Sequence, residues 1–220
     1  MPPARFITLW LSCLCSLPAA AWQAQNRLQI DHGKLTIDRS KSIAEITRAQ
    51  ASGGFKATQG ADIGLGLFQS RMTASVEIKP LTGDRLALST RIQTTPVIYV
   101  AREFAEDSCA YKLILGHEWQ HYLFDREALR HVHTELPRLT ADAFNRDAPV
   151  TQANLENAKR SFMQRLTHTY DGFAFPLHAR IDNPEAYAAL SRQCNGEIGK
   201  QLGKPSAAQA PKNAVGTPGT

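Results

Sequence analysis

The chain has 220 residues, of which 43% are hydrophobic, and this is enough for one domain with a single core. Its formal net charge is +5, but the basic residues are not clustered, so the composition argues against a nucleic-acid partner. Mild basicity of this kind suits approach to an anionic envelope surface.

The first 21 residues are typical of a secretory signal peptide. Arg5 supplies a positive charge, residues 6–17 form an apolar run, and Ala19 to Ala21 offer a small-residue cleavage site, so that Trp22 would begin the mature protein. The apolar run is too short to span a bilayer, and no stable membrane span is expected. The sequence therefore predicts a periplasmic or secreted protein.

The mature protein is expected to be one domain over residues 22–202, because the chain after Gly203 has almost no core-forming residue. The tail, residues 203–220, is predicted to be disordered. The domain keeps two cysteines, Cys109 and Cys194, and an even pair in an exported chain is most simply a disulfide. Such a bridge would close a loop of about 85 residues and stabilise the fold by up to about 4 kcal/mol.

The first half of the domain is predicted to be rich in β-structure. Two alternating segments, residues 28–30 and 34–37, surround the turn Asp31-His32-Gly33 and predict a hairpin. A short helix is expected at residues 42–50, ended by the Gly53-Gly54 pair. Further strands are predicted at residues 73–78, 86–92 and 96–100, with a turn-forming cluster at 80–84. We expect an α+β fold in which a small antiparallel sheet leads into a helical half.

The clearest indication of function is the segment His117-Glu118-Trp119-Gln120-His121. On a helix, positions four apart lie about 40° round and about 6 Å along, so both imidazoles can face one ion. Two histidine nitrogens make half of a tetrahedral zinc site and leave room for a third protein ligand and a water. Glu118 lies too far round to share the ion but can take a proton from that water as general base. The pattern predicts a zincin-like hydrolase.

The third metal ligand must come from another element. The metal-binding helix is expected to begin after Ser108 and to stop at Pro137. On a straight helix Glu127 points away from the metal, and His131 lies about 15 Å along the axis from His121. Neither ligates easily, and both are expected to be solvated or packed residues of the helix.

A second helix is predicted from Val150 along an apolar stripe that ends at Tyr170. Asp171 and His178 follow where that helix is expected to end, which suits a ligand approaching from outside, and we rank His178 first and Asp171 second. Glu156 is a further carboxylate, expected on the surface. Tyr170 could donate a hydrogen bond to a developing oxyanion, although its place in the stripe also suits core packing. A last helix is expected to begin at Asp182-Asn183-Pro184-Glu185.

These segments resemble a bacterial family of secreted zinc-dependent proteases that is catalogued as a domain of unknown function. The likeness is carried by Pro96 to His121, by the pair Tyr170-Asp171 with a following histidine, and by Asp182 to Cys194. It implies a zincin-type fold, a zinc ion, and peptide or protein substrates such as envelope components. The family has a Tyr-Asp-x-x-Thr-x-His segment, in which this chain lacks the threonine and has His178 two positions late. The third ligand therefore stays open among His178, Asp171, Glu156 and Glu127.

A function of a different class fits the same sequence. The protein could be a non-catalytic envelope binding or assembly factor in which the metal is structural or absent. A structural zinc site needs a closed shell of four protein ligands, whereas this segment carries its own base. We therefore predict a zinc metallopeptidase, with Glu118 as the general base.

Overall fold

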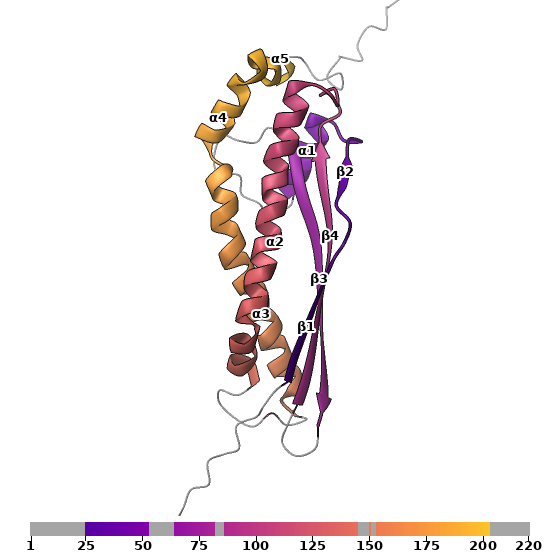
Figure 1. The fold of residues 1–220 in the computed structure, drawn as a ribbon, viewed down its shortest axis with the longest axis vertical. Coiled ribbons are helices and arrows are strands. Elements are labelled where there is room, and N and C mark those ends of the chain that lie inside the picture. Colours follow the sequence, from indigo (N-terminus) through magenta and orange to yellow (C-terminus); the bar gives the residue numbers. More distant parts are fainter. Residues whose placement is uncertain (1–24, 53–63, 82–85, 145–149, 151–152, 203–220) are drawn as a thin grey trace, which may run out of the picture.

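The computed structural model describes residues 25–52, 64–81, 86–144, 150 and 153–202. The predicted signal peptide and tail lie outside the described residues, as do the Gly53-Gly54 pair and residues 82–84 of the predicted turn. The described part is elongated and has two layers, with two long helices lying along one face of a narrow sheet (Figure 1).

The central strand of the sheet is β4 (Leu86–Val100). Along one edge it pairs antiparallel with β3 (Gly66–Pro80) over the whole length of both strands. Along the other edge it pairs parallel with β1 (Gln25–His32) and then with β2 (Thr36–Asp38). The predicted α+β class is confirmed, but the expectation of an antiparallel sheet is wrong because two of the three pairings are parallel.

The hairpin predicted for residues 28–30 and 34–37 is also wrong. Both segments run in the same direction along β4, as two pieces of one interrupted strand. Between them the backbone N–H of Gly33 donates to the carbonyl of Thr94 at 2.9 Å, which keeps the chain against β4 where a hairpin would turn it back. A Cβ atom at position 33 would lie 2.3 Å from that carbonyl oxygen, so this close approach requires glycine.

The two strands predicted at residues 86–92 and 96–100 are parts of the single strand β4. Pro96 lies in the gap between its two parallel partners, since β1 ends opposite Thr94 and β2 begins opposite Val97. A proline, which has no N–H group, is tolerated there because neither β1 nor β2 lies opposite it on that edge. Side chains of β4 alternate between buried and more exposed positions, so only one face of the strand lies in the core.

The helices are α1 (Ile43–Ser52), α2 (Cys109–Phe144), α3 (Leu155–Ile181), α4 (Pro184–Arg192) and α5 (Glu197–Leu202), with a 3-10 turn η1 (Cys194–Gly196) before the last. The predicted helix at residues 42–50 is confirmed by α1. Its first turn is closed by Ser42 and Glu45, each of which accepts a hydrogen bond from the other's backbone N–H, at 3.3 Å and 2.7 Å. None of the described helices combines the length and apolar character needed to cross a bilayer.

Two helices run further than the sequence predicts, and each contains a proline: α2 continues past Pro137, where it is expected to stop, and α3 continues past Tyr170. Pro137 lies inside α2, flanked by the buried side chains of Leu136 and Leu139, and Pro176 lies inside α3. A proline costs a helix one hydrogen bond and some strain. Burial of the apolar residues around Pro137 outweighs that cost, because each contributes on the order of 2 kcal/mol.

The long helices α2 and α3 pack on each other and on the sheet to form the core. One cluster joins Leu129 and Val132 of α2 to Phe162 and Leu166 of α3 and to Ile92 of β4. A second cluster lies at the other end of the molecule, around Phe104, the start of α2, α1 and α5. The sheet and α3 therefore support α2 along most of its length, which makes it a rigid base for functional side chains.

The start of α2 is tied to the C-terminal elements. Cys109 and Cys194 form a disulfide with their Cα atoms 5.6 Å apart, as the even cysteine pair predicts. Beside it, the carboxylate of Glu197 accepts a hydrogen bond from the backbone N–H of Ala110 at 3.2 Å, which satisfies a donor left free in the first turn of α2. Ile198 of α5 is fully buried in the second cluster. These contacts hold α4, η1 and α5 against the helix that carries the predicted metal ligands.

Candidate metal centre

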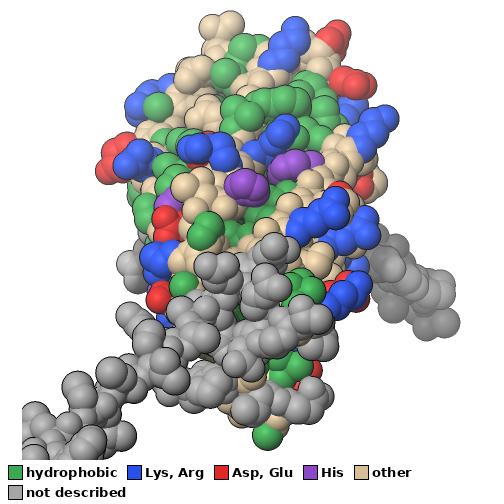
Figure 2. All heavy atoms as spheres, turned by 60° about the horizontal axis from the view of Figure 1, so that its bottom comes forward, with side chains coloured by type: hydrophobic (Ala, Val, Ile, Leu, Met, Phe, Trp, Pro, Cys, Tyr) green, Lys and Arg blue, Asp and Glu red, His purple; other side chains and the backbone are tan. Residues whose placement is uncertain are grey.

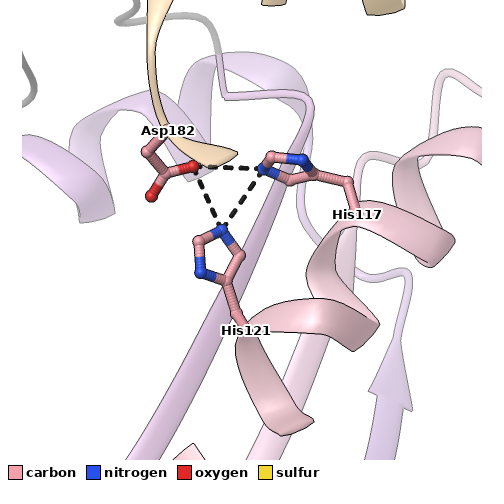
Figure 3. Close-up of side chains that lie close together, drawn as sticks. All are labelled: His117, His121 and Asp182. Atoms are coloured by element: carbon pink, nitrogen blue, oxygen red, sulfur yellow. Dashed lines mark hydrogen bonds and ion pairs between the residues drawn. The ribbon is translucent and has the colours of Figure 1, made fainter. Parts of the chain in front are cut away.

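Three side chains from two parts of the chain converge on one point (Figure 3). The Nε2 atoms of His117 and His121, one turn apart on α2, are 3.2 Å from each other, and each is 3.1 Å from Oδ1 of Asp182. Zinc bonds of about 2.0–2.1 Å at tetrahedral angles separate neighbouring ligand atoms by about 3.3 Å. The three donor atoms, which we call the triad, therefore have types and a spacing that suit a metal ion such as zinc.

Asp182 is held in place by the break between two helices. α3 ends at Ile181, and the side chain of Asn183 caps α4 by accepting a hydrogen bond from the N–H of Ala186 at 2.8 Å. Pro184 occupies the first position of α4, where a missing N–H is harmless. The N–H of Asp182 still donates to the carbonyl of His178, at 2.9 Å. Asp182 thus lies at a fixed junction between α3 and α4, which we call the elbow, with its carboxylate pointing at α2.

The sequence prediction named other residues as the third ligand. α3 runs almost three turns further than expected beyond Tyr170, so Asp171 lies exposed on the helix and His178 lies beside the triad rather than in it. Glu156 is exposed in the first turn of α3, and Glu127 pairs with Arg130 at the surface of α2, as expected for both.

The sequence does not predict Asp182 as a member of the triad. The residues Asp182-Asn183-Pro184 were interpreted only as the start of a helix, which they are. The indication available in the sequence was an acidic residue placed directly before a helix cap and a proline. Such a residue must lie at a helix junction, outside the regular side-chain directions of either helix.

The charge of Asp182 suits a cation site. Burial alone would raise the pKa of its carboxyl group, but hydrogen bonds from His117, His121 and Tyr187 hold that pKa well below its usual range. Burial also disfavours the charged form of His117, and there the hydrogen bond to Asp182 and the charges of Glu118 and Asp182 outweigh it, so that the pKa of His117 rises. The cluster therefore contains an anionic oxygen at every ordinary pH, facing two imidazole nitrogens.

Glu118 lies next to the triad, between α2 and the beginning of β3. The residue is only 6% exposed, and its carboxylate accepts a hydrogen bond from the backbone N–H of Phe68. Burial raises the pKa of Glu118 more than the charges of the two neighbouring histidines lower it. A Cβ atom at Gly66 would lie 2.7 Å from the Glu118 side chain and 2.8 Å from Ile114, so glycine at this point of β3 makes the room that Glu118 occupies.

The two tyrosines near the site have different surroundings. Tyr170 donates its hydroxyl hydrogen to the buried carboxylate of Asp125 and packs against the larger core cluster, so its hydroxyl is directed at Asp125 and not at the triad. Tyr187 of α4 donates to Oδ1 of Asp182 at 3.0 Å, and its ring centre is 5.5 Å from that of His117. Tyr187 is therefore the tyrosine at the triad. The sequence does not single out Tyr187, because it belongs to no recognisable motif. Its position at the triad depends on the helix junction at Asp182.

His178 contacts the triad from behind. Its Nδ1 is 2.5 Å from Nδ1 of His121, the ring nitrogen that faces away from Asp182. The ring of Phe124 meets His178 edge-on, with centroids 5.9 Å apart. Burial and the nearby His121 lower the pKa of His178 to about 4, so its ring is neutral over the physiological range.

The triad is open on the side of Asp182. The side chain of Asp182 is 36% exposed, whereas those of His117 and His121 are 12% and 8% exposed. Figure 2 shows one face of the molecule on which Lys and Arg side chains are spread among apolar ones, with histidine side chains reaching the surface near its middle. An ion held by the triad would therefore keep a side that solvent can reach.

No family model, curated protein or solved structure matches the chain. The side chains described above are thus the grounds on which a function can be assigned.

Proposed function

We propose that the protein is an exported zinc-dependent hydrolase that cleaves peptide bonds. The observation that carries the proposal is the triad of His117, His121 and Asp182, with donor atoms 3.1–3.2 Å apart, beside the buried carboxyl group of Glu118. Catalytic zinc sites use three protein ligands and keep one position for water or substrate, whereas structural sites close the shell with a fourth. The described residues offer three donor atoms and an exposed flank, which supports catalysis.

The residues around the triad divide the chemistry between them. A zinc ion held there would supply a Lewis acid that polarises a carbonyl group and makes a water acidic near neutral pH. Glu118 is the general base that takes the proton from the attacking water and delivers it to the leaving amine.

Tyr187 is the candidate donor to the carbonyl oxygen as negative charge develops on it. Its hydroxyl lies 3.0 Å from Oδ1 of Asp182, beside the position that a zinc ion would take. The hydroxyl donates to Asp182 in this structure, so it would turn from that carboxylate to the carbonyl oxygen as negative charge develops there. Tyr187 takes the role that the sequence assigned to Tyr170.

The edge of β3 favours an extended peptide as the substrate. One edge of β3 pairs with β4, and in the described part of the chain no strand pairs along the other. A peptide can add to such an edge as an extra strand, held by backbone hydrogen bonds. At the start of β3 the edge is already occupied, since Gln50 donates to the carbonyl of Gly66 at 3.0 Å and the N–H of Phe68 donates to Glu118. A peptide would therefore add along β3 beyond Phe68, next to the residue that contacts the general base.

The predicted signal peptide and the disulfide support a periplasmic or secreted location, since disulfides persist in oxidising compartments. Protein components of the cell envelope are the substrates that such a location makes accessible. The sequence resemblance to secreted zinc-dependent proteases supports the same assignment.

The test compares wild-type protein with Glu118→Gln, after zinc loading, in digestion of casein and of a peptide library. We expect one zinc per chain in both proteins, and a loss of turnover of about 10²–10⁴-fold in the variant. Glu127→Gln is the matched control, because it changes an exposed glutamate of the same helix and should keep both zinc and turnover. Zinc binding without turnover in the wild type would indicate a structural metal and a non-catalytic envelope factor. A wild type that binds no zinc would refute the metal centre.

A further inference from the structure

His121 and His178 are joined edge to edge. Their two Nδ1 atoms are 2.5 Å apart, their ring planes differ by 14°, and their ring centroids are 4.8 Å apart. Because the centroids are so much further apart than the nitrogens, the rings lie nearly in one plane and do not stack face to face. This is the geometry of a hydrogen bond in which one ring nitrogen donates and the other accepts.

The direction of that hydrogen bond follows from what His121 would do at its other nitrogen. Nε2 of His121 faces His117 and Asp182, and it must present a lone pair in order to bind a cation. A neutral imidazole that binds through one nitrogen carries its proton on the other, and metal-binding histidines almost always donate that proton to a fixed acceptor. Nδ1 of His121 is therefore the donor, and Nδ1 of His178 is the acceptor.

His178 is itself firmly placed. It lies one turn before Asp182 on α3, and its carbonyl accepts the backbone N–H of Asp182 at 2.9 Å. The edge-on contact with Phe124 of α2 limits rotation of its ring. The last turn of α3 and the residue after it thus supply both Asp182, a proposed ligand, and His178, the partner of His121.

Resting on the proposed zinc site, we propose that His178 is a positioning residue: it accepts the Nδ1–H of His121 and so fixes the tautomer and the ring orientation with which His121 presents Nε2 to the ion. His178 does not touch the ion, because the nitrogen it contacts lies on the far side of the His121 ring. It also leaves the exposed flank of the triad open for a substrate.

Zinc affinity tests the proposal directly, measured by competition with a chelator on the full exported chain. His178→Leu removes the acceptor and keeps an apolar side chain against Phe124, and we expect zinc to bind about 10–100-fold more weakly. His178→Asn keeps an acceptor oxygen on Cγ, and we expect it to recover most of that loss. His131→Leu is the matched control, because His131 also lies between α2 and α3, where it stacks on Phe173 away from the triad. We expect it to bind zinc like the wild type.

A second measurement separates positioning from folding. In the zinc-bound wild type, NMR should show a slowly exchanging proton on Nδ1 of His121, and His178→Leu should lose it while the metal-free Tm stays close to that of the His131→Leu control. Wild-type zinc affinity in His178→Leu would overturn the proposal, as would a loss of affinity that His178→Asn shares in full.

The outcome is distinguishable from that of the proposed function. Weaker zinc binding in His178→Leu, with recovery in His178→Asn, supports the positioning role even if no peptide is cleaved. Absence of zinc from the wild type would overturn both.

Discussion

Tyr170→Phe tests most directly whether Tyr170 has a structural role, while Tyr187 is the tyrosine at the triad. The substitution removes one hydroxyl group and leaves the ring in its packing against the core. That hydroxyl donates a hydrogen bond to Asp125, a residue that is 2% exposed. We expect the variant to lose stability and to keep both its zinc affinity and its turnover, because Tyr170 contacts none of the triad.

The magnitude follows from the burial of the carboxylate. A hydrogen bond to a charged group contributes about 1.5–3 kcal/mol, and leaving a buried acceptor with fewer partners costs a similar amount. For a chain of this size, each kcal/mol lowers Tm by about 2–4 °C. The free energy of unfolding of Tyr170→Phe should therefore fall by about 1.5–3 kcal/mol near pH 8, and Tm by about 3–12 °C.

The cost should depend on pH with a definite sign. Burial raises the pKa of Asp125 more than the hydrogen bond from Tyr170 lowers it. A carboxyl group with a raised folded-state pKa stabilises the fold below its unfolded pKa of about 3.9 and loses that contribution as the pH rises through the folded value. Removal of Tyr170 raises the folded pKa further, so the variant loses more between pH 4 and pH 8 than the wild type does.

Urea denaturation of both proteins at pH 4 and pH 8 measures the effect. As the pH falls and Asp125 takes up a proton, the hydroxyl of Tyr170 bonds a neutral group, and the difference between the two proteins should shrink toward about 1 kcal/mol, the contribution of a neutral hydrogen bond. An equal difference at both pH values would refute the pairing with an ionised Asp125. A variant that keeps its stability but loses turnover would show that Tyr170 has a catalytic role.

Two further changes probe the ligand set and the packing of the base. Asp182→Asn keeps the shape of the proposed third ligand but removes its charge. Isothermal titration should show zinc binding at least about 100-fold weaker, because loss of a partner outside the ligand set already costs about 10–100-fold. Unchanged affinity would exclude Asp182 as a ligand. Gly66→Ala places a methyl group 2.7 Å from the Glu118 side chain, so it should destabilise the protein by about 1–3 kcal/mol and reduce turnover. Gly172→Ala is its control, because a methyl group added there meets nothing within 4 Å. An equal Tm for the two variants would show that the Glu118 side chain shifts aside without loss of stability.

Local chemistry accounts for the parts of the structure that could be predicted. The start of α2 follows from Ser108, whose hydroxyl accepts the N–H of Tyr111 at 3.1 Å. The approach of His117 to His121 follows from helix geometry alone, since a spacing of four residues brings the rings together on any helix. Such features need only a few neighbouring residues, and sequence patterns describe those well.

The errors all concern contacts between distant segments. Proline statistics place the end of α2 at Pro137, but packing against the sheet and α3 carries the helix on to Phe144. The same continuation in α3 places His178 in the helix, against Nδ1 of His121, and it brings Asp182 to the Nε2 atoms of His117 and His121. The third ligand could be found only after the length of α3 was known, because one turn of helix more or less presents a different residue.

The bond between Cys109 and Cys194 encloses every candidate residue of the centre, from His117 to Tyr187, in one covalent ring of chain. A single cut of the backbone between α2 and α3 would therefore not release either half. The fragment with the two imidazoles and the fragment with the aspartate would stay linked through the disulfide after cleavage by a protease. On a gel such a nicked molecule would run as one species until a thiol was added, and as two afterwards.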